Sequence, residues 1–192
     1  MPPKVKFSRE EIISAALDMV RKNGTACVTA RALGEKLGTS SRPIFTAFQN
    51  MEELHGEVIS AAKAVYNRYI EEGLKQIPAF KGVGVQYIRF AQEEPKLFQV
   101  LFMSEQSDNP NLDSVLPIID GNYDLILASV KNGYGLSFNE AERLYKHLWI
   151  YSHGIAALCA TKMCRFSPDE INSMLTEVFI GQLKAIKLKE EK

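Results

Sequence analysis

Four helix starts are marked in this sequence by capping boxes, in which a small polar residue is followed three positions later by an acidic residue. The pairs are Ser8 and Glu11, Asn50 and Glu53, Ser137 and Glu140, and Ser167 and Glu170. In such a pair each side chain accepts a hydrogen bond from the backbone N–H of the other residue, which satisfies donors that a helix leaves free at its start. No segment alternates apolar and polar residues long enough to predict a sheet. The sequence therefore predicts an all-α fold.

Apolar residues spaced three and four apart, together with Gly and Pro breaks, divide the chain into about nine expected helices. Their approximate ranges are 9–23, 29–37, 40–48, 51–72, 83–92, 95–103, 112–131, 138–162 and 168–187. Residues 104–111 read as a polar loop. We expect three parts: residues 1–50 with three short helices, a connector helix over 51–73, and a helical bundle over 74–192.

The composition excludes several classes of protein. No apolar run approaches the roughly 18–20 residues that a membrane span needs, and no apolar signal core follows the first lysines, so we expect a cytoplasmic chain that contacts no membrane. The three cysteines do not suit a disulfide framework. Cys159 and Cys164 lie five residues apart, a spacing that matches no zinc site. We expect neither a metal nor a cofactor.

Charge is distributed unevenly along the chain, although the 23 basic and 23 acidic residues cancel. Residues 1–50 hold eight basic and four acidic side chains, so this segment carries +4 and the remainder carries −4. Such an asymmetry is consistent with contact between the N-terminal segment and a polyanion such as nucleic acid, and it is weak support by itself.

Residues 29–48 have the pattern of a helix-turn-helix, two short helices joined by a turn that contains Gly38. Leu33 and Ile44 fall on faces that can pack on the first helix, which leaves hydroxyl and guanidinium groups pointing outward. These groups suit DNA because they donate to phosphate oxygens, and Arg can also bond guanine in a bidentate way. The alternative is a helical hairpin that only packs, with Arg31 and Arg42 as solvated charges.

The same region resembles the DNA-binding domain of the tetracycline-repressor (TetR/AcrR) family of transcriptional regulators. The positions that match its motif are Thr29, Leu33, Gly34, Leu37, Gly38, Thr39, Ser40, Ile44, Phe45, Phe48 and Leu54. Where that family often has Gly, Tyr, His and Lys, this chain has Arg42, Phe45, Ala47 and Met51. The residues that we expect to contact double-stranded operator DNA are Thr29, Arg31, Ser40, Ser41, Arg42, Pro43, Phe45 and Thr46.

The start of the second of these helices has an unusual sequence. Pro43 has no N–H and disfavours helical geometry at Arg42, so the Ser40 hydroxyl is expected to accept a hydrogen bond from the Arg42 N–H.

The C-terminal part resembles the same family more loosely. Trp149, His153 and Gly154 match the Trp-x-x-x-His-Gly pattern of one branch. Trp149 and His153 share a helical face and can join other aromatic residues around a mostly apolar cavity for a small-molecule effector. The candidate ligand-binding residues are Phe90, Phe98, Phe102, Tyr123, Trp149 and His153. The alternative for each is a place in the core, where aromatic residues are more common.

The last two expected helices carry long apolar stripes. In the resembled family such helices pair with those of a second copy, which implies a homodimer here. The candidate interface residues are Leu144, Ile155, Ile171, Met174, Leu175, Val178, Phe179 and Leu183. An intramolecular hairpin alone is the other possibility.

Together these features predict a DNA-binding transcriptional regulator, most simply a repressor that an effector releases from its operator. The rival prediction is an all-helical small-molecule carrier or an enzyme. Against an enzyme, the sequence has no catalytic triad signature, no Gly-rich phosphate loop and no metal-ligand spacing. We therefore predict no catalytic residues.

Overall fold

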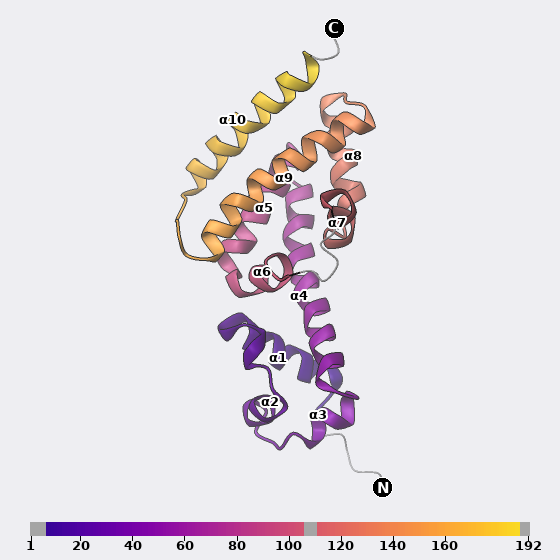
Figure 1. Ribbon diagram of the computed structural model, residues 1–192, viewed down its shortest axis with the longest axis vertical. Coiled ribbons are helices and arrows are strands. Elements are labelled where there is room, and N and C mark those ends of the chain that lie inside the picture. The colour runs from indigo at the N-terminus through magenta and orange to yellow at the C-terminus, as the bar shows by residue number, and fades with distance from the viewer. Residues whose placement is uncertain (1–6, 106–110, 189–192) are drawn as a thin grey trace. The chain divides into compact units, whose positions relative to one another are not determined.

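The computed structural model describes residues 7–105 and 111–188, and within these ranges it is all-α. The described residues form ten α-helices, whose arrangement Figure 1 shows. Their bounds are α1 (Arg9–Asn23), α2 (Ala30–Lys36), α3 (Arg42–Ala47), α4 (Met51–Leu74), α5 (Ala79–Glu93), α6 (Pro95–Phe102), α7 (Leu112–Ile119), α8 (Tyr123–Tyr134), α9 (Phe138–Ala160) and α10 (Pro168–Lys187), with a short 3-10 turn over Thr25–Cys27. The predicted fold class is confirmed.

Three of the four predicted capping boxes form in full, at Ser8, Ser137 and Ser167. The fourth differs. The Glu53 N–H donates to Asn50 Oδ1 at 2.8 Å, but the Glu53 carboxylate accepts from the Gln49 N–H at 2.6 Å. The predicted residues thus stabilise the start of α4, but the Glu53 carboxylate accepts the N–H of Gln49 in place of that of Asn50.

The helix predicted over 112–131 is in fact two helices. Asp120 ends α7 with an extended backbone (φ −109°, ψ 98°), and its Oδ1 accepts a hydrogen bond from the Asn122 N–H at 3.1 Å. A side chain that bonds its own backbone two residues on forms a turn in place of a helical hydrogen bond. This break explains why the described residues form ten α-helices and not about nine. The helix predicted over 83–92 also begins earlier, at Ala79.

The chain divides into two compact units. Unit 1 comprises residues 1–65 and 96–104, and unit 2 comprises residues 66–95 and 105–192. Helix α4 contributes its residues through Val65 to unit 1 and the rest to unit 2. Polar loop residues 106–110 lie outside the described ranges.

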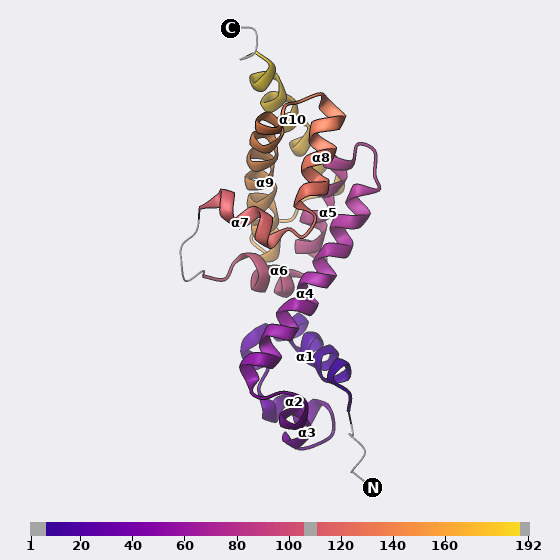
Figure 2. The ribbon, with the colours of Figure 1, turned by 90° about the vertical axis from the view of Figure 1, so that its right-hand side faces the viewer.

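The core of unit 1 is made by α1 and the helices that pack on it. Helix α1 contacts α2, and α2 contacts α3 (Figure 2). The side chains of Ile12, Leu33, Ile44 and Leu54 are fully buried there. At about 25 cal/mol for each Å² of apolar surface removed from water, such residues supply most of the stability of a small helical unit.

In unit 2, helix α9 is central, since it packs on α5, α8 and α10 (Figures 1 and 2). Helix α5 also contacts α8 and α10. Close approach at the start of α5 depends on glycine, because a Cβ on Gly73 would lie 2.7 Å from the Cα of Val83. This packing sets the position of α5, which supplies several residues of the cavity described below.

Candidate functional sites

Helices α2 and α3 form the predicted helix-turn-helix within unit 1. Thr29 caps α2 by accepting the Ala32 N–H at 3.2 Å, and Gly38 follows α2 with a φ of +64°. A positive φ is readily adopted only by a residue without a Cβ, so the turn requires glycine at this place.

The start of α3 has the irregular cap that its sequence predicts. Helix α3 begins at Arg42, and the Ser40 Oγ accepts the Arg42 N–H at 3.4 Å. Ser41 makes no side-chain capping bond. The predicted hydrogen bond from the Arg42 N–H to the Ser40 hydroxyl is confirmed, and Pro43 occupies the first turn, where its missing N–H removes no hydrogen bond.

A second glycine lets α2 approach this turn. A Cβ added to Gly34 would lie 3.0 Å from the carbonyl carbon and oxygen of Ser40. The backbone of Thr39 also bonds to Gly34, its N–H donating to the Gly34 carbonyl at 2.9 Å. The angle between the two helices is therefore fixed by backbone contacts, which makes the outward face of α3 a defined surface.

The helix-turn-helix exposes most of the predicted DNA-contacting residues. Thr29, Arg31, Ser40, Arg42, Phe45 and Thr46 are exposed, and Ser41 and Pro43 are half-buried. Phe45 is the unusual member, because half of its apolar side chain (52%) faces solvent.

Besides the capping bonds of Thr29 and Ser40, two more of these side chains have intramolecular partners. Arg31 pairs with Glu35 at 3.0 Å, and the Thr46 hydroxyl donates to the Arg42 carbonyl at 3.0 Å. Exposed ion pairs of this kind contribute only about 0.2–1 kcal/mol, so Arg31 is available to another anion.

Arg9 contacts the end of α3, a feature that the sequence did not reveal. Its Nη1 donates to the Ala47 carbonyl at 2.8 Å, and its Nη2 lies 2.8 Å from Glu53 and 2.7 Å from Glu57. Its guanidinium also lies 4.2 Å from the centre of the Phe48 ring. Arg9 thus joins α1, the end of α3 and the start of α4, and its charge is compensated by two carboxylates.

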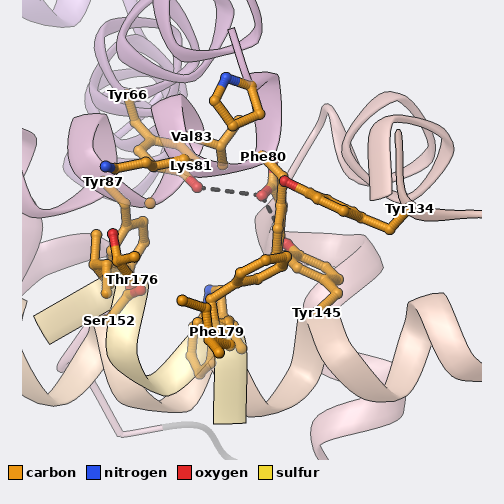
Figure 3. Close-up of a pocket in the computed structure, with 17 residues that line it drawn as sticks. Tyr66, Phe80, Lys81, Val83, Tyr87, Tyr134, Tyr145, Ser152, Thr176 and Phe179 are labelled. Atoms are coloured by element: carbon orange, nitrogen blue, oxygen red, sulfur yellow. Dashed lines mark hydrogen bonds between the residues drawn. The ribbon is translucent and has the colours of Figure 1, made fainter. Parts of the chain in front are cut away.

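Unit 2 contains a cavity of about 370 Å³, a size typical of small-molecule sites. Figure 3 shows it enclosed largely by aromatic rings from α4, α5, α8, α9 and α10. These rings belong to Tyr66, Phe80, Tyr87, Tyr134, Tyr145, Trp149 and Phe179. Its polar side chains beyond the tyrosines and the tryptophan are few: Lys81, Asp120, Ser152 and Thr176.

Asp120 is the most buried charged group of this lining, with 2% of its surface exposed. Its Oδ2 accepts hydrogen bonds from the Tyr145 hydroxyl at 3.0 Å and the Tyr66 hydroxyl at 3.4 Å, the dashed lines of Figure 3. Burial raises the pKa of Asp120, and the hydrogen bonds from Asn122, Tyr145 and Tyr66 oppose that rise. Burial likewise raises the pKa of Tyr66 and of Tyr145.

The predicted ligand-binding residues are dispersed by the structure. Trp149 lines the cavity, and His153 lies beside it with its ring stacked on the indole at 4.9 Å. The Tyr87 hydroxyl and His153 Nδ1 are 2.9 Å apart. Trp149 Nε1 is buried and has no hydrogen-bond partner in the described part of the chain. Of this pair, Trp149 is therefore a lining residue and His153 is its neighbour outside the lining.

The other four predicted residues do not line it. Phe90 is fully buried between the rings of Tyr66 and Tyr69, at 5.5 and 5.3 Å. The Tyr123 hydroxyl donates to Glu142 at 3.0 Å. Phe98 and Phe102 of α6 pack on each other at 5.1 Å, and both belong to unit 1. Helical spacing did not distinguish these packing positions from cavity positions.

The predicted interface residues are also divided. Leu144, Ile155, Ile171 and Leu175 are buried within the single chain, which leaves them little surface for a partner. Met174, Val178, Phe179 and Leu183 are half-buried, and Leu175 and Phe179 line the cavity. The large apolar residues that α9 and α10 expose are instead Phe138 and Ile150, both at 55%, and Ile180, at 44%, which also borders the cavity.

Comparison with known proteins identifies the fold. Neither a protein-family model nor a curated protein sequence matches this chain. Among solved structures, it is similar to the fatty acid degradation regulator FadR from Bacillus halodurans (TM-score 0.61, 16% identity, 95% of this chain and 96% of that chain). It is also similar to a candidate transcriptional regulator from Streptomyces coelicolor A3(2) (TM-score 0.50, 17% identity, 96% and 98%). At such identities the likeness establishes a shared all-helical fold.

None of the helices in the described ranges has both the length and the apolar character needed to span a bilayer.

Proposed function

We propose that this chain is a DNA-binding transcriptional regulator whose unit 1 reads an operator and whose unit 2 binds a small-molecule effector. The observation that carries the proposal is the helix-turn-helix of α2 and α3, with Leu33 and Ile44 buried beneath it and Arg42, Phe45 and Thr46 exposed on its outer face. The two structural neighbours, which are described as regulators, support it.

On DNA, the exposed groups of α3 would enter the major groove. Arg42 is suited to base edges or phosphates, and the ring of Phe45 is suited to the methyl group of thymine. Thr29, Arg31 and Ser40 would contact the backbone phosphates. In this assignment residues 1–50 form the DNA-binding domain, residues 51–73 the connector, and residues 74–192 the effector and dimerisation domain.

The effector would occupy the cavity of unit 2. An apolar cavity with a few polar groups suits recognition of a small organic molecule. The unpaired Trp149 Nε1 is consistent with this, because an acceptor on a bound molecule would remove the cost of a buried N–H without a partner. A repressor released by its effector is the simplest scheme, and the effector must bind one conformation more tightly than the other.

A homodimer would place two copies of α3 on a roughly palindromic site, with half-sites about 34–36 Å or a multiple apart. Because four of the predicted interface residues are buried within the chain, we assign the dimer surface to the outer faces of α9 and α10, around Ile150 and Ile180. Light scattering coupled to chromatography tests this part, and a monomer at micromolar concentration would refute it.

DNA binding is tested with the full chain. Operator fragments are selected from mixed genomic DNA, and their affinity is measured by fluorescence anisotropy over a range of salt concentrations. We expect affinity to fall steeply with salt, since bound phosphates release counterions. Arg42→Ala should weaken operator binding about tenfold or more.

The matched control for this experiment is Arg68→Ala, which removes the same charge from an exposed position on α4 within unit 2. It should leave operator binding unchanged. Failure of the wild-type chain to enrich any fragment would refute the proposal and favour the alternative, an all-helical binding protein or enzyme.

A further inference from the structure

The carboxylate of Asp120 is buried at the cavity wall with no cationic partner. Its three hydrogen-bond donors are the hydroxyls of Tyr145 and Tyr66 and the backbone N–H of Asn122, all of them neutral. No lysine, arginine or histidine within residues 7–105 and 111–188 forms an ion pair with it. Buried charges in proteins are normally paired. A positive charge on a bound molecule would supply that missing partner.

The surfaces around this carboxylate are also suited to a cation. The rings of Tyr66 and Tyr87 meet edge to face at 6.0 Å, and those of Phe80 and Tyr145 meet at 6.2 Å. All four line the cavity. An aromatic face attracts a cation within about 6 Å of its centre, and the attraction increases where water is excluded. The rest of the lining is mainly apolar, both aliphatic and aromatic, so a ligand must also bring apolar bulk.

Lys81 is the one cationic side chain of the described lining. It suggests the opposite ligand class, an anionic amphiphile. Two observations weigh against that class. Lys81 is only half-buried, on a flexible stem, whereas Asp120 is held in place by three hydrogen bonds. An anion in the cavity would also share a low-dielectric space with the Asp120 carboxylate, which is unfavourable.

We propose that the cavity binds a lipophilic organic cation, such as a quaternary ammonium or a hydrophobic amine, with Asp120 as its counter-ion and Tyr66, Tyr87 and Tyr145 around its charged group. This inference rests on the proposed function, in which the cavity binds an effector, and it adds the chemical class of that effector. Asp120 and the tyrosines recognise the positive centre, and the aliphatic residues of α9 and α10 hold the apolar part.

The chain contains a single tryptophan, and Trp149 lines the cavity, so its fluorescence reports binding directly. The probes are decyltrimethylammonium, decanol and decanoate, each kept below its micellar concentration at constant ionic strength. They share an apolar chain and differ in charge. We expect decyltrimethylammonium to bind about tenfold more tightly than decanol, and decanoate to bind most weakly. Tighter binding of decanoate than of the ammonium would overturn the proposal.

Asp120→Asn keeps the shape and removes the charge. It should lower the affinity for decyltrimethylammonium about tenfold and leave that for decanol within about twofold. The matched control is Asp124→Asn, an exposed position on α8, which should change neither affinity. Unchanged binding of the ammonium by Asp120→Asn would overturn the proposal.

A second variant covers the case in which Asp120→Asn does not fold. Lys81→Gln removes a positive charge from the same lining, so it should maintain or increase the affinity for decyltrimethylammonium. A loss of that affinity would contradict the proposal. The titration contains no DNA, so it tests the cation site separately from the regulator function. If the chain binds the ammonium but no DNA, the proposed regulator function is refuted and the cation site is supported.

Discussion

The Tyr145 hydroxyl donates a hydrogen bond of 3.0 Å to Oδ2 of Asp120, which joins α9 to the break between α7 and α8. Both residues are almost fully buried. A hydrogen bond to a buried carboxylate is stronger than one between neutral groups, because the acceptor has little contact with water. This contact therefore stabilises both the fold of unit 2 and the wall of its cavity.

Tyr145→Phe should destabilise the chain, because it removes the donor and leaves the ring. We expect the free energy of unfolding at neutral pH to fall by about 1–3 kcal/mol, as measured by urea denaturation. Tyr134→Phe is the matched control, since the Tyr134 hydroxyl makes no hydrogen bond in the described structure and its ring lines the same cavity. Equal losses in the two variants would contradict the role given to this hydrogen bond.

The pH dependence of stability should change with Asp120→Asn. Burial raises the pKa of Asp120 in the folded state, so the folded chain binds a proton more tightly than the unfolded chain. The stability linked to this group is thus fully present below its unfolded pKa of about 3.9 and is lost as pH rises through the folded pKa.

The measurement is urea denaturation of wild type and Asp120→Asn at several values between pH 4 and 7. We expect the wild type to lose stability relative to the variant as pH rises over this window. A difference that stayed constant, or that changed in favour of the wild type with rising pH, would show that the folded state does not raise the pKa of Asp120.

Two adjacent residues of α3 should separate folding from DNA binding. Ile44 is fully buried, so Ile44→Ala should lower the free energy of unfolding by about 2–5 kcal/mol. Phe45 is half-exposed, so Phe45→Ala should change it by no more than about 0.5 kcal/mol while weakening operator binding. Denaturation and anisotropy on the same preparations distinguish the two effects, and a Phe45→Ala chain with wild-type operator affinity would remove Phe45 from the DNA-contacting surface.

Local features of this fold were predictable from the sequence. The capping boxes at Ser8, Ser137 and Ser167, the turn at Gly38 and the hydrogen bond from Arg42 N–H to Ser40 all involve residues within a few positions of one another. Their geometry follows from the preferences of single residues for particular backbone conformations. The all-α fold follows from the same local rules.

The cavity was not predictable in the same way, because its residues come from separate helices. Helical periodicity places Phe90 and Tyr87 on α5 equally well, yet the packing of α5 directs only Tyr87 to the cavity. Asp120 left a weak signal, a lone acid directly after the apolar run of residues 115–119. Recognising it required knowing that two tyrosines from α4 and α9 meet there.

The neighbours Trp149 and His153 provide a final prediction, concerning fluorescence. Their rings are stacked at 4.9 Å with an angle of 13° between their planes, and burial lowers the pKa of His153. A protonated imidazole in this position quenches the indole. The emission of the single tryptophan should therefore decrease as the pH is lowered. Because the folded pKa is depressed, the fall should be centred below the ordinary histidine value of about 6.5.

His153→Gln should abolish this titration, whereas His147→Gln, at an exposed position on the same helix, should preserve it. The same shift has a consequence for stability: the unfolded chain takes up the proton first, so the stability linked to His153 is lost as pH falls from its unfolded pKa through its folded one. A quenching midpoint at or above 6.5 would show that the imidazole is solvated and does not lie in the buried stack beside the cavity.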